Sequence, residues 1–380
     1  MPRLCRCLAL LLLLAIFFAL PTAAAPTDAP TALPTDAPKS SARAMALLDA
    51  HSGTLLAAQN ATQRLPMAST TKIMTALVAI EHLPLDRIVT VPQAAVGIEG
   101  SSIYLYAGEQ ITVQTLLYGL LLSSANDAAV ALALEVGGSI PAFAAKMNEK
   151  AHTLGLFDTH FCNPNGLHEE GHYTTAKDLA RLTAAALSND VFAEIVSTRR
   201  YTAPQNGTDA TRLFLNHNRL LRTYEGAIGV KTGFTKAAGR CLVSAATREG
   251  LTLVCVTLSC PDDWRDHTAL LDFGFSRYER VTPALPALTL PVVAGDVSQV
   301  ALCAPVAPSF TLPRQRGDLR CVLELPRFLY GGFAKGKTVG KLIYYLDGMK
   351  IGEIPLCTAT ASAPEKPLGF WARWKRFFQG

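Results

Sequence analysis

Several features that mark common protein classes are scarce or missing in this 380-residue sequence. It has no glycine-rich phosphate loop of the Walker or dinucleotide type, which argues against nucleotide binding. Only 17% of the residues are charged, and the net charge of +5 is mild and spread along the chain, so nothing indicates nucleic acid binding. The apolar content of 49% instead favours a globular protein, long enough for two domains with cores of their own.

The N-terminal apolar run is too short to cross a membrane comfortably. Arg3 and Arg6 precede this run, which extends over residues 8–20, and Ala23-Ala24-Ala25 then offers an A-x-A cleavage site. We therefore expect residues 1–25 to be a secretory signal peptide and the protein to be exported. Residues 26–40 contain Pro-Thr-Asp-Ala-Pro twice and are predicted to form a proline-rich tether.

The cysteines do not show the spacing of a metal site or of a disulfide scaffold. Of the nine, Cys5 and Cys7 precede the expected cleavage site, which leaves an odd number, 9 − 2 = 7, in the mature chain. Cys241 and Cys255 lie in apolar runs and are predicted to be small buried hydrophobic residues. A bridge between Cys303 and Cys321 stays open at this point, because sequence alone does not establish pairing.

The hydrophobic pattern of residues 41–278 predicts strands near both ends and helices between them. The expected strands are 44–48, 54–57, 228–232, 240–247 and 251–258, and the expected helices are 73–80, 113–123, 126–136, 140–154, 174–187 and 262–274. This order indicates an α/β domain in which one sheet is assembled from the two ends and a helical subdomain lies between them.

The C-terminal part has a different pattern. Residues 279–358 show short strands broken by prolines, and Asp347-Gly348 between two such strands is a strong hairpin signal, so we expect a small all-β domain. Residues 359–380 are predicted to be a linker followed by an amphipathic helix. Its aromatic stripe consists of Phe370, Trp371, Trp374, Phe377 and Phe378, with Arg373, Lys375 and Arg376 between them. Such a helix suits a membrane interface; the alternative is packing against its own domain.

The stretch Met67-Ala68-Ser69-Thr70-Thr71-Lys72 precedes the first predicted helix. Ser69 stands where the helix would start, a position at which serine caps free N–H groups. Residues three apart share one helix face, so Ser69 and Lys72 are expected to touch. A lysine whose pKa is lowered by burial or by a nearby cation can take the proton of a serine nucleophile. The alternative for this motif alone is a capped helix with a solvated lysine.

Two further short motifs carry suitable chemistry. Ser124-Ala125-Asn126 falls at a break between two apolar helices, where a hydroxyl and an amide could pass a proton and hold a substrate amide. Lys231-Thr232-Gly233 ends a predicted strand, where Lys231 and Thr232 could hold a carboxylate and Gly233 permits a close backbone approach. The ordered set Ser-x-x-Lys, Ser-x-Asn, Lys-Thr-Gly is typical of penicillin-binding proteins and the related β-lactamases.

With these motifs the chain resembles the D-alanyl-D-alanine carboxypeptidases among the low-molecular-mass penicillin-binding proteins. The resemblance covers about residues 44–278 and includes Asn163-Pro164-Asn165-Gly166-Leu167, Gly239-Arg240-Cys241-Leu242-Val243 and Leu270-Leu271-Asp272-Phe273-Gly274. It implies a β-lactamase/DD-peptidase-like fold, an antiparallel sheet with flanking helices. It also implies that the β domain and the final helix serve as a stalk and a peripheral anchor on the extracytoplasmic face of the bacterial cytoplasmic membrane.

The resemblance also implies the role of each site residue. Ser69 is the acylated nucleophile, Lys72 its base and Ser124 the relay of a proton to the departing D-alanine. Asn126 holds the peptide, and Lys231 and Thr232 bind its terminal carboxylate. The backbone N–H groups of Ser69 and Phe234 form the oxyanion hole. The implied substrates are peptidoglycan stem peptides that end in D-Ala-D-Ala, the implied inhibitors are β-lactam antibiotics, and no cofactor or metal is implied.

Other functions remain as alternatives. A β-lactamase or a DD-endopeptidase would share the three motifs, although the terminal module argues mildly against both. A wall-binding scaffold without activity is disfavoured because all three motifs are intact. His168-Glu169-Glu170-Gly171-His172 matches the zinc-protease sequence H-E-x-x-H, in which the two histidines bind the metal. That chemistry requires a helix, whereas the preceding Asn-Pro-Asn-Gly and Gly171 predict a surface loop.

Overall fold

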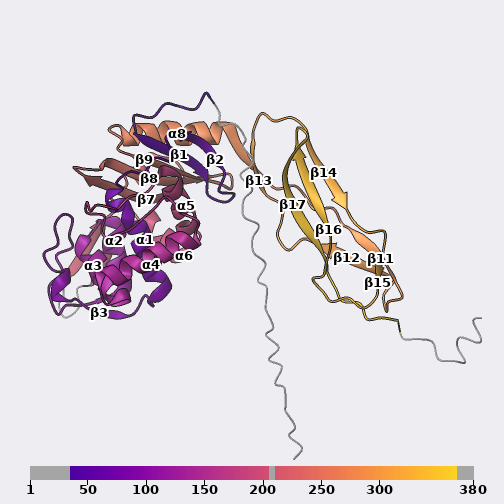
Figure 1. The fold of residues 1–380 in the computed structure, drawn as a ribbon, viewed down its shortest axis with the longest axis horizontal. Helices are drawn as coiled ribbons and strands as arrows, with labels where there is room; N and C mark the ends of the chain where they lie inside the picture. Colours follow the sequence, from indigo (N-terminus) through magenta and orange to yellow (C-terminus); the bar gives the residue numbers. More distant parts are fainter. Residues whose placement is uncertain (1–34, 205–209, 366–380) are drawn as a thin grey trace, which may run out of the picture. The chain divides into compact units, whose positions relative to one another are not determined.

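The computed structural model describes residues 35–204 and 210–365 (Figure 1). The predicted signal peptide, most of the proline-rich tether and the aromatic stripe of residues 370–378 lie outside the described residues. Within them the structure confirms an α/β domain with an antiparallel sheet, followed by an all-β domain. The boundaries at residues 41, 278 and 358 stay predictions.

The first domain is built on a five-stranded sheet with the order β2-β1-β9-β8-β7, in which all neighbouring strands are antiparallel. Its strands are β1 (Ala44–Asp49), β2 (Leu55–Gln59), β7 (Ala227–Thr235), β8 (Gly239–Arg248) and β9 (Leu251–Leu258). The first two strands therefore join a sheet whose other three come about 170 residues later. This arrangement confirms the prediction of one sheet assembled from both ends of the domain.

The two faces of the sheet are covered by different helices. Side chains alternate along a strand, so Ala44, Ala46 and Leu48 of β1 belong to the core shared with the helical region. Met45 and Leu47 face the opposite way and pack with α8 (Asp263–Arg277), which covers that face in Figure 1. The sheet is apolar on both sides because it is sandwiched between these two cores.

The helical region supplies the other layer. It contains α1 (Lys72–His82), α2 (Val113–Leu122), α3 (Asn126–Gly137), α4 (Ile140–Thr153), α5 (Ala176–Leu187) and α6 (Asp190–Ser197). The sequence did not indicate α6, nor the hairpin of β5 (Arg200–Pro204) and β6 (Thr211–Leu215). Among the described helices none alone is long and apolar enough to span a membrane; α3 and α4 pass that test only as a pair bent by 84°.

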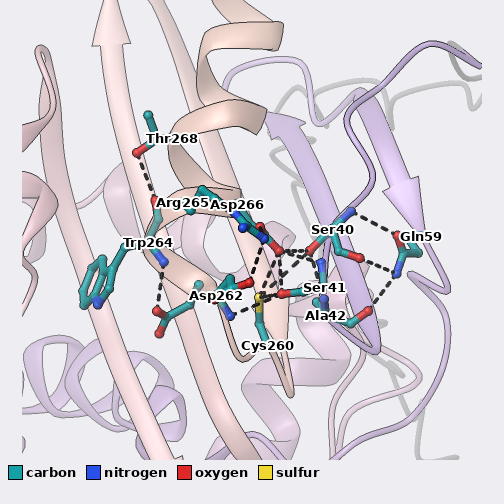
Figure 2. Close-up of polar contacts among 11 residues, drawn as sticks. Ser40, Ser41, Ala42, Gln59, Cys260, Asp262, Trp264, Arg265, Asp266 and Thr268 are labelled. Carbon is teal, nitrogen blue, oxygen red and sulfur yellow. Dashed lines mark hydrogen bonds and ion pairs between the residues drawn. The ribbon is translucent and has the colours of Figure 1, made fainter.

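Shorter elements complete the domain. These are η1 (Ala68–Thr71), β3 (Ile88–Thr90), η2 (Gln93–Ala95), β4 (Gln110–Thr112) and α7 (Leu220–Thr223). Figure 2 shows how the segment before β1 is tied to α8. The carboxylate of Asp266 accepts hydrogen bonds from the Ser40 hydroxyl at 2.9 Å and from the Ser41 backbone N–H at 2.6 Å. The chain entering the domain is thereby held against the helix that closes it.

The all-β domain contains β10 (Tyr278–Val281), β11 (Thr289–Val293), β12 (Gln299–Cys303), β13 (Phe310–Pro313), β14 (Leu319–Glu324), β15 (Leu329–Tyr330), β16 (Thr338–Leu346) and β17 (Met349–Thr358). Strands β16 and β17 form the predicted hairpin. Asp347 and Gly348 at its tip have φ values of 50° and 82°, as a tight turn between two such strands requires.

The same sheet rules out the Cys303–Cys321 bridge that the sequence left open. The strand order β14-β16-β17-β12 places two strands between Cys321 on β14 and Cys303 on β12. Three inter-strand steps span about 14 Å, and a disulfide requires Cα atoms within about 7 Å. Cys303 lies opposite Cys357 instead, and all seven described cysteines are free.

Candidate active site

Ser69 lies in a tight turn and not at a capped helix start. The 3₁₀ turn η1 contains Ser69, α1 begins three residues later, and no side chain caps either element. The expectation that Ser69 caps the helix is therefore wrong. Its hydroxyl has a different partner, the Nζ of Lys72 at 2.9 Å. The contact predicted from the three-residue spacing is thus present. The Ser69 hydroxyl bonds to the lysine amine and does not cap a backbone N–H group.

Lys72 is fully buried and its amine makes three polar contacts. Besides the Ser69 hydroxyl, Nζ lies 2.7 Å from Oδ1 of Asn126 and 2.6 Å from the backbone carbonyl of Asn165. The Asn126 side chain cannot be turned around, because its Nδ2 donates to the carbonyl of Glu99. Lys72 therefore faces two groups that can only accept a hydrogen bond and one hydroxyl that can also donate.

All three partners can accept a hydrogen bond, so they fit either protonation state of Lys72. A neutral amine has two N–H groups and one lone pair. If its two N–H groups go to Oδ1 of Asn126 and the Asn165 carbonyl, the lone pair is left for the Ser69 hydroxyl, which then donates to it. This is the arrangement that the predicted roles of Ser69 as nucleophile and Lys72 as base require.

The surroundings of Lys72 favour that neutral state. Burial lowers the pKa of Lys72 well below its ordinary value, and the positive charge of Lys231 lowers it further, while Asp127 acts in the opposite direction. The lowering agrees with the sequence argument that burial and a nearby cation would make this lysine a base.

Asn126 is held in place by the segment before α2. Its backbone N–H donates to the Ser101 carbonyl at 2.7 Å, in addition to the Nδ2 contact with Glu99. Ser124 lies two residues earlier, in the predicted break between α2 and α3, with a φ of 60°. It is buried, and among the described residues its hydroxyl has no hydrogen-bond partner. The break positions both residues of the Ser-x-Asn motif, and Asn126 is the one that is hydrogen-bonded to Lys72.

Strand β7 brings the Lys-Thr-Gly motif to η1 (Ala68–Thr71), called the nucleophile turn from here on because Ser69 is the predicted nucleophile. A Cβ atom on Gly233 would lie 3.0 Å from the backbone nitrogen of Ser69, so the two backbones run in direct contact. Lys231 is buried, and within the described residues its Nζ donates only to the carbonyl of Thr232, at 2.9 Å. Burial lowers the pKa of Lys231 to about 7. Phe234 follows, and 65% of its surface is exposed.

The loop after α4 supports the nucleophile turn from another side. Gly166 has a φ of 85°, and a Cβ atom there would lie 2.0 Å from the carbonyl oxygen of Ala68. Only glycine allows this approach. The preceding residue, Asn165, supplies the carbonyl that Lys72 contacts. The Asn-Pro-Asn-Gly sequence predicted a turn, but a backbone acceptor leaves no mark in the sequence, so this part of the site was missed.

The zinc-protease sequence lies in a loop, as predicted from its glycine and its flanking residues. Residues 168–171 are exposed, whereas His172 is buried, so the expectation of a surface loop is wrong for that histidine. Within residues 35–204 and 210–365 no group of three His, Cys, Asp or Glu side chains could hold a metal ion. A second histidine, His217, is near Lys231: burial lowers its pKa, and the Lys231 charge lowers it further. No sequence pattern linked His172 or His217 to the residues around Ser69.

The site thus brings together a serine hydroxyl, a buried lysine and a second buried lysine on the neighbouring strand, as the three sequence motifs predicted. Comparison with known proteins identifies the class of the protein. Residues 31–262 match the family model described as D-alanyl-D-alanine carboxypeptidase, and residues 286–363 match the C-terminal domain of penicillin-binding protein 5. The chain therefore belongs to the D-alanyl-D-alanine carboxypeptidase family, within the low-molecular-mass penicillin-binding proteins, and is a serine-type carboxypeptidase.

Individual relatives agree with this assignment. The chain is 33% identical over 350 residues to the D-alanyl-D-alanine carboxypeptidase DacF of Bacillus subtilis, covering 88% of each chain. It is 36% identical over 335 residues to DacC of Escherichia coli, with 83% of this chain and 82% of DacC covered. The crystal structure of penicillin-binding protein 5 from Haemophilus influenzae superposes with a TM-score of 0.73 at 29% identity, covering 86% of this chain and 98% of that one.

Proposed function

We propose that this protein removes the terminal D-alanine from peptidoglycan stem peptides through an acyl-enzyme on Ser69. The observation that carries the proposal is the 2.9 Å contact between the Ser69 hydroxyl and the buried amine of Lys72, whose lowered pKa favours the neutral form that can take the proton. Attack of Ser69 on the D-Ala-D-Ala amide would release D-alanine, and water would then free the shortened peptide. Penicillins would acylate the same hydroxyl.

The remaining site residues have roles that their surroundings support. An oxyanion hole from the N–H groups of Ser69 and Phe234 is supported by the contact of Gly233 with the Ser69 backbone, because it brings both amides to one place. Lys231 as carboxylate ligand, with Thr232, is supported by a buried amine that has a single carbonyl partner. Ser124, with its unpaired hydroxyl, would return the proton to the leaving D-alanine.

A carboxypeptidase is favoured over the related alternative of an endopeptidase. A D-alanyl-D-alanine endopeptidase of Pseudomonas aeruginosa is 34% identical, but the alignment covers 63% of this chain, against 88% for the carboxypeptidase DacF. The match to the C-terminal domain of penicillin-binding protein 5 lies in the part beyond residue 286. The carboxypeptidases DacF and DacC therefore match more of the chain than this endopeptidase does.

Export and membrane attachment form part of the same proposal. The N-terminal signal sequence would take the protein across the cytoplasmic membrane, and the aromatic stripe of residues 370–378 would attach it peripherally to the outer face of that membrane. A substrate in the cell wall would then lie on the same side as the enzyme. Support for this part comes from the sequence pattern alone.

The direct test is to incubate the purified protein with a short peptide ending in D-Ala-D-Ala and to measure free D-alanine. The proposal predicts release by the wild-type protein, none by Ser69→Ala, and no loss on addition of EDTA. A peptide ending in L-Ala-L-Ala serves as the control. Cleavage of cross-linked muropeptides without release from the linear peptide would favour an endopeptidase. Loss of activity in EDTA would favour the zinc alternative.

A further inference from the structure

The buried His172 contacts the nucleophile turn, and the proposed mechanism does not use it. Both of its ring nitrogens have partners. Nδ1 lies 3.0 Å from the backbone nitrogen of Cys162, and Nε2 lies 2.8 Å from the hydroxyl of Thr71. Thr71 follows Ser69 by two residues, and its hydroxyl also lies 2.8 Å from the carbonyl oxygen of Ala68. A continuous chain of hydrogen bonds thus runs from the 160–173 loop to the residue before the nucleophile.

The position of the proton in each of these three hydrogen bonds can be assigned. The backbone N–H of Cys162 can only donate, so Nδ1 of His172 is an acceptor. The Ala68 carbonyl can only accept, so the single proton of the Thr71 hydroxyl points to it. The hydroxyl therefore accepts from His172, and Nε2 carries the ring proton. The imidazole is the neutral Nε2–H tautomer, with no other assignment that satisfies all three contacts.

The hydrogen-bond chain ends at the Ala68 carbonyl, which belongs to the peptide group before Ser69. The carbonyl of Ala68 and the N–H of Ser69 belong to the same peptide group, which is planar and trans, so the two bonds point in opposite directions. Fixing the carbonyl oxygen fixes the direction of that N–H. Ala68 also has a φ of 48°, an unfavourable value for alanine that needs support from its surroundings. The Thr71 hydroxyl and Gly166 both contact this carbonyl.

We propose that His172 is a positioning residue that orients the Ser69 N–H of the oxyanion hole by fixing the Thr71 hydroxyl on the Ala68 carbonyl. The inference rests on the proposed function, since it assigns the oxyanion role to Ser69. It also gives a purpose to the second histidine of the H-E-x-x-H sequence, which serves the serine site as a hydrogen-bonding group.

The state of the imidazole agrees with this role. Burial lowers the pKa of His172 to about 4, and the neighbouring His160 and His168 lower it in the same direction. The ring is therefore neutral at neutral pH, as its partners require. Phe161 packs edge-on against it, with ring centroids 5.8 Å apart, and restricts its rotation.

The first test compares His172→Leu with His172→Gln. Leucine removes both hydrogen bonds, whereas the glutamine amide can still donate to Thr71. Loss of one oxyanion donor costs roughly 10²–10³-fold in kcat, so we expect a misoriented donor to cost about 10–100-fold. The measured quantities are kcat and KM on a D-Ala-D-Ala peptide and the rate of acylation by a fluorescent penicillin. His172→Leu should lower kcat and the acylation rate with little change in KM, and His172→Gln should recover most of both.

The second test asks whether His172 acts through Thr71. Thr71→Val removes the hydroxyl with little change of shape and should cause the same loss as His172→Leu, whereas Thr71→Ser should restore the rate. The double variant His172→Leu/Thr71→Val should be no worse than either single variant, because both break one chain of contacts. Additive losses would overturn the proposal.

A matched control is available in His267 of α8. It is also buried, and its ring nitrogens lie 2.5 Å from the Ser244 hydroxyl and 2.9 Å from that of Thr257. His267→Leu should lower the melting temperature and leave kcat unchanged. If it lowers kcat as much as His172→Leu, or if His172→Leu lowers only the melting temperature, the positioning role is wrong. Failure of the proposed function would look different, since the wild-type protein itself would then not be acylated.

Discussion

The contact between Gly166 and the nucleophile turn gives the sharpest quantitative prediction. In Gly166→Ala the new Cβ would lie 2.0 Å from the Ala68 carbonyl oxygen, whereas unstrained contacts begin near 3.4 Å. The loop and the turn must therefore separate by 3.4 − 2.0 = 1.4 Å. A misplacement of about 1 Å can cost on the order of 10²-fold in rate. We expect the rate of Ser69 acylation by a labelled penicillin to fall by roughly that factor.

Gly171 provides the matched control for backbone strain. Its φ of 87° is nearly that of Gly166, 85°, but a Cβ atom there would meet nothing closer than 3.6 Å. Both alanine variants should lose roughly 1–2 kcal/mol of stability from the left-handed conformation, measured by thermal or urea unfolding. Gly171→Ala should keep the wild-type acylation rate to within about twofold. Equal acylation rates in Gly166→Ala and Gly171→Ala would show that the close contact of Gly166 with the Ala68 carbonyl does not hold the nucleophile turn in place.

Three further predictions concern the two lysines and the C-terminus. Lys72→Met should lower the acylation rate by roughly 10²–10⁴-fold, because it removes the amine that takes the Ser69 proton; acylation at the wild-type rate would contradict the base assignment. Because the pKa of Lys231 in the free enzyme is about 7, its charge is present below that pH and lost above it. The kcat/KM on a D-Ala-D-Ala peptide should therefore decline as the pH rises through about 7, and a flat profile would argue against Lys231 as the carboxylate ligand. Deleting residues 367–380 should abolish sedimentation with anionic phospholipid vesicles and preserve D-alanine release; vesicle binding by the truncated protein would exclude the anchor.

The sequence predicted those parts of the fold that local patterns determine. Short apolar runs bounded by turn residues identified the strands of the main sheet, and Asp347-Gly348 identified the hairpin of the second domain. The sequence did not indicate α6 or the hairpin of β5 and β6. That hairpin pairs only with itself, and Tyr201 on it stacks against Tyr118 of α2 at 3.6 Å. A contact between residues so far apart in the sequence leaves no repeating pattern of apolar residues from which the hairpin could be predicted.

The candidate site was predictable to the extent that side chains define it. The three-residue spacing correctly predicted that Ser69 and Lys72 touch. The backbone carbonyl of Asn165 could not be predicted, because any residue type supplies one. The sequence motif suggested only a zinc ligand for His172. Its contact with Thr71 could not be predicted, because the two residues are 101 positions apart. The helix cap expected of Ser69 failed because its hydroxyl pairs with the lysine instead.

Whether the Ser69 hydroxyl, activated by the buried Lys72, is the attacking group can be read from the mass of the penicillin-treated protein. We expect the intact mass to increase by one penicillin molecule, the modified proteolytic peptide to contain Ser69, and Ser69→Ala to gain no mass. A penicillin adduct on any other residue, or on the Ser69→Ala variant, would contradict this assignment.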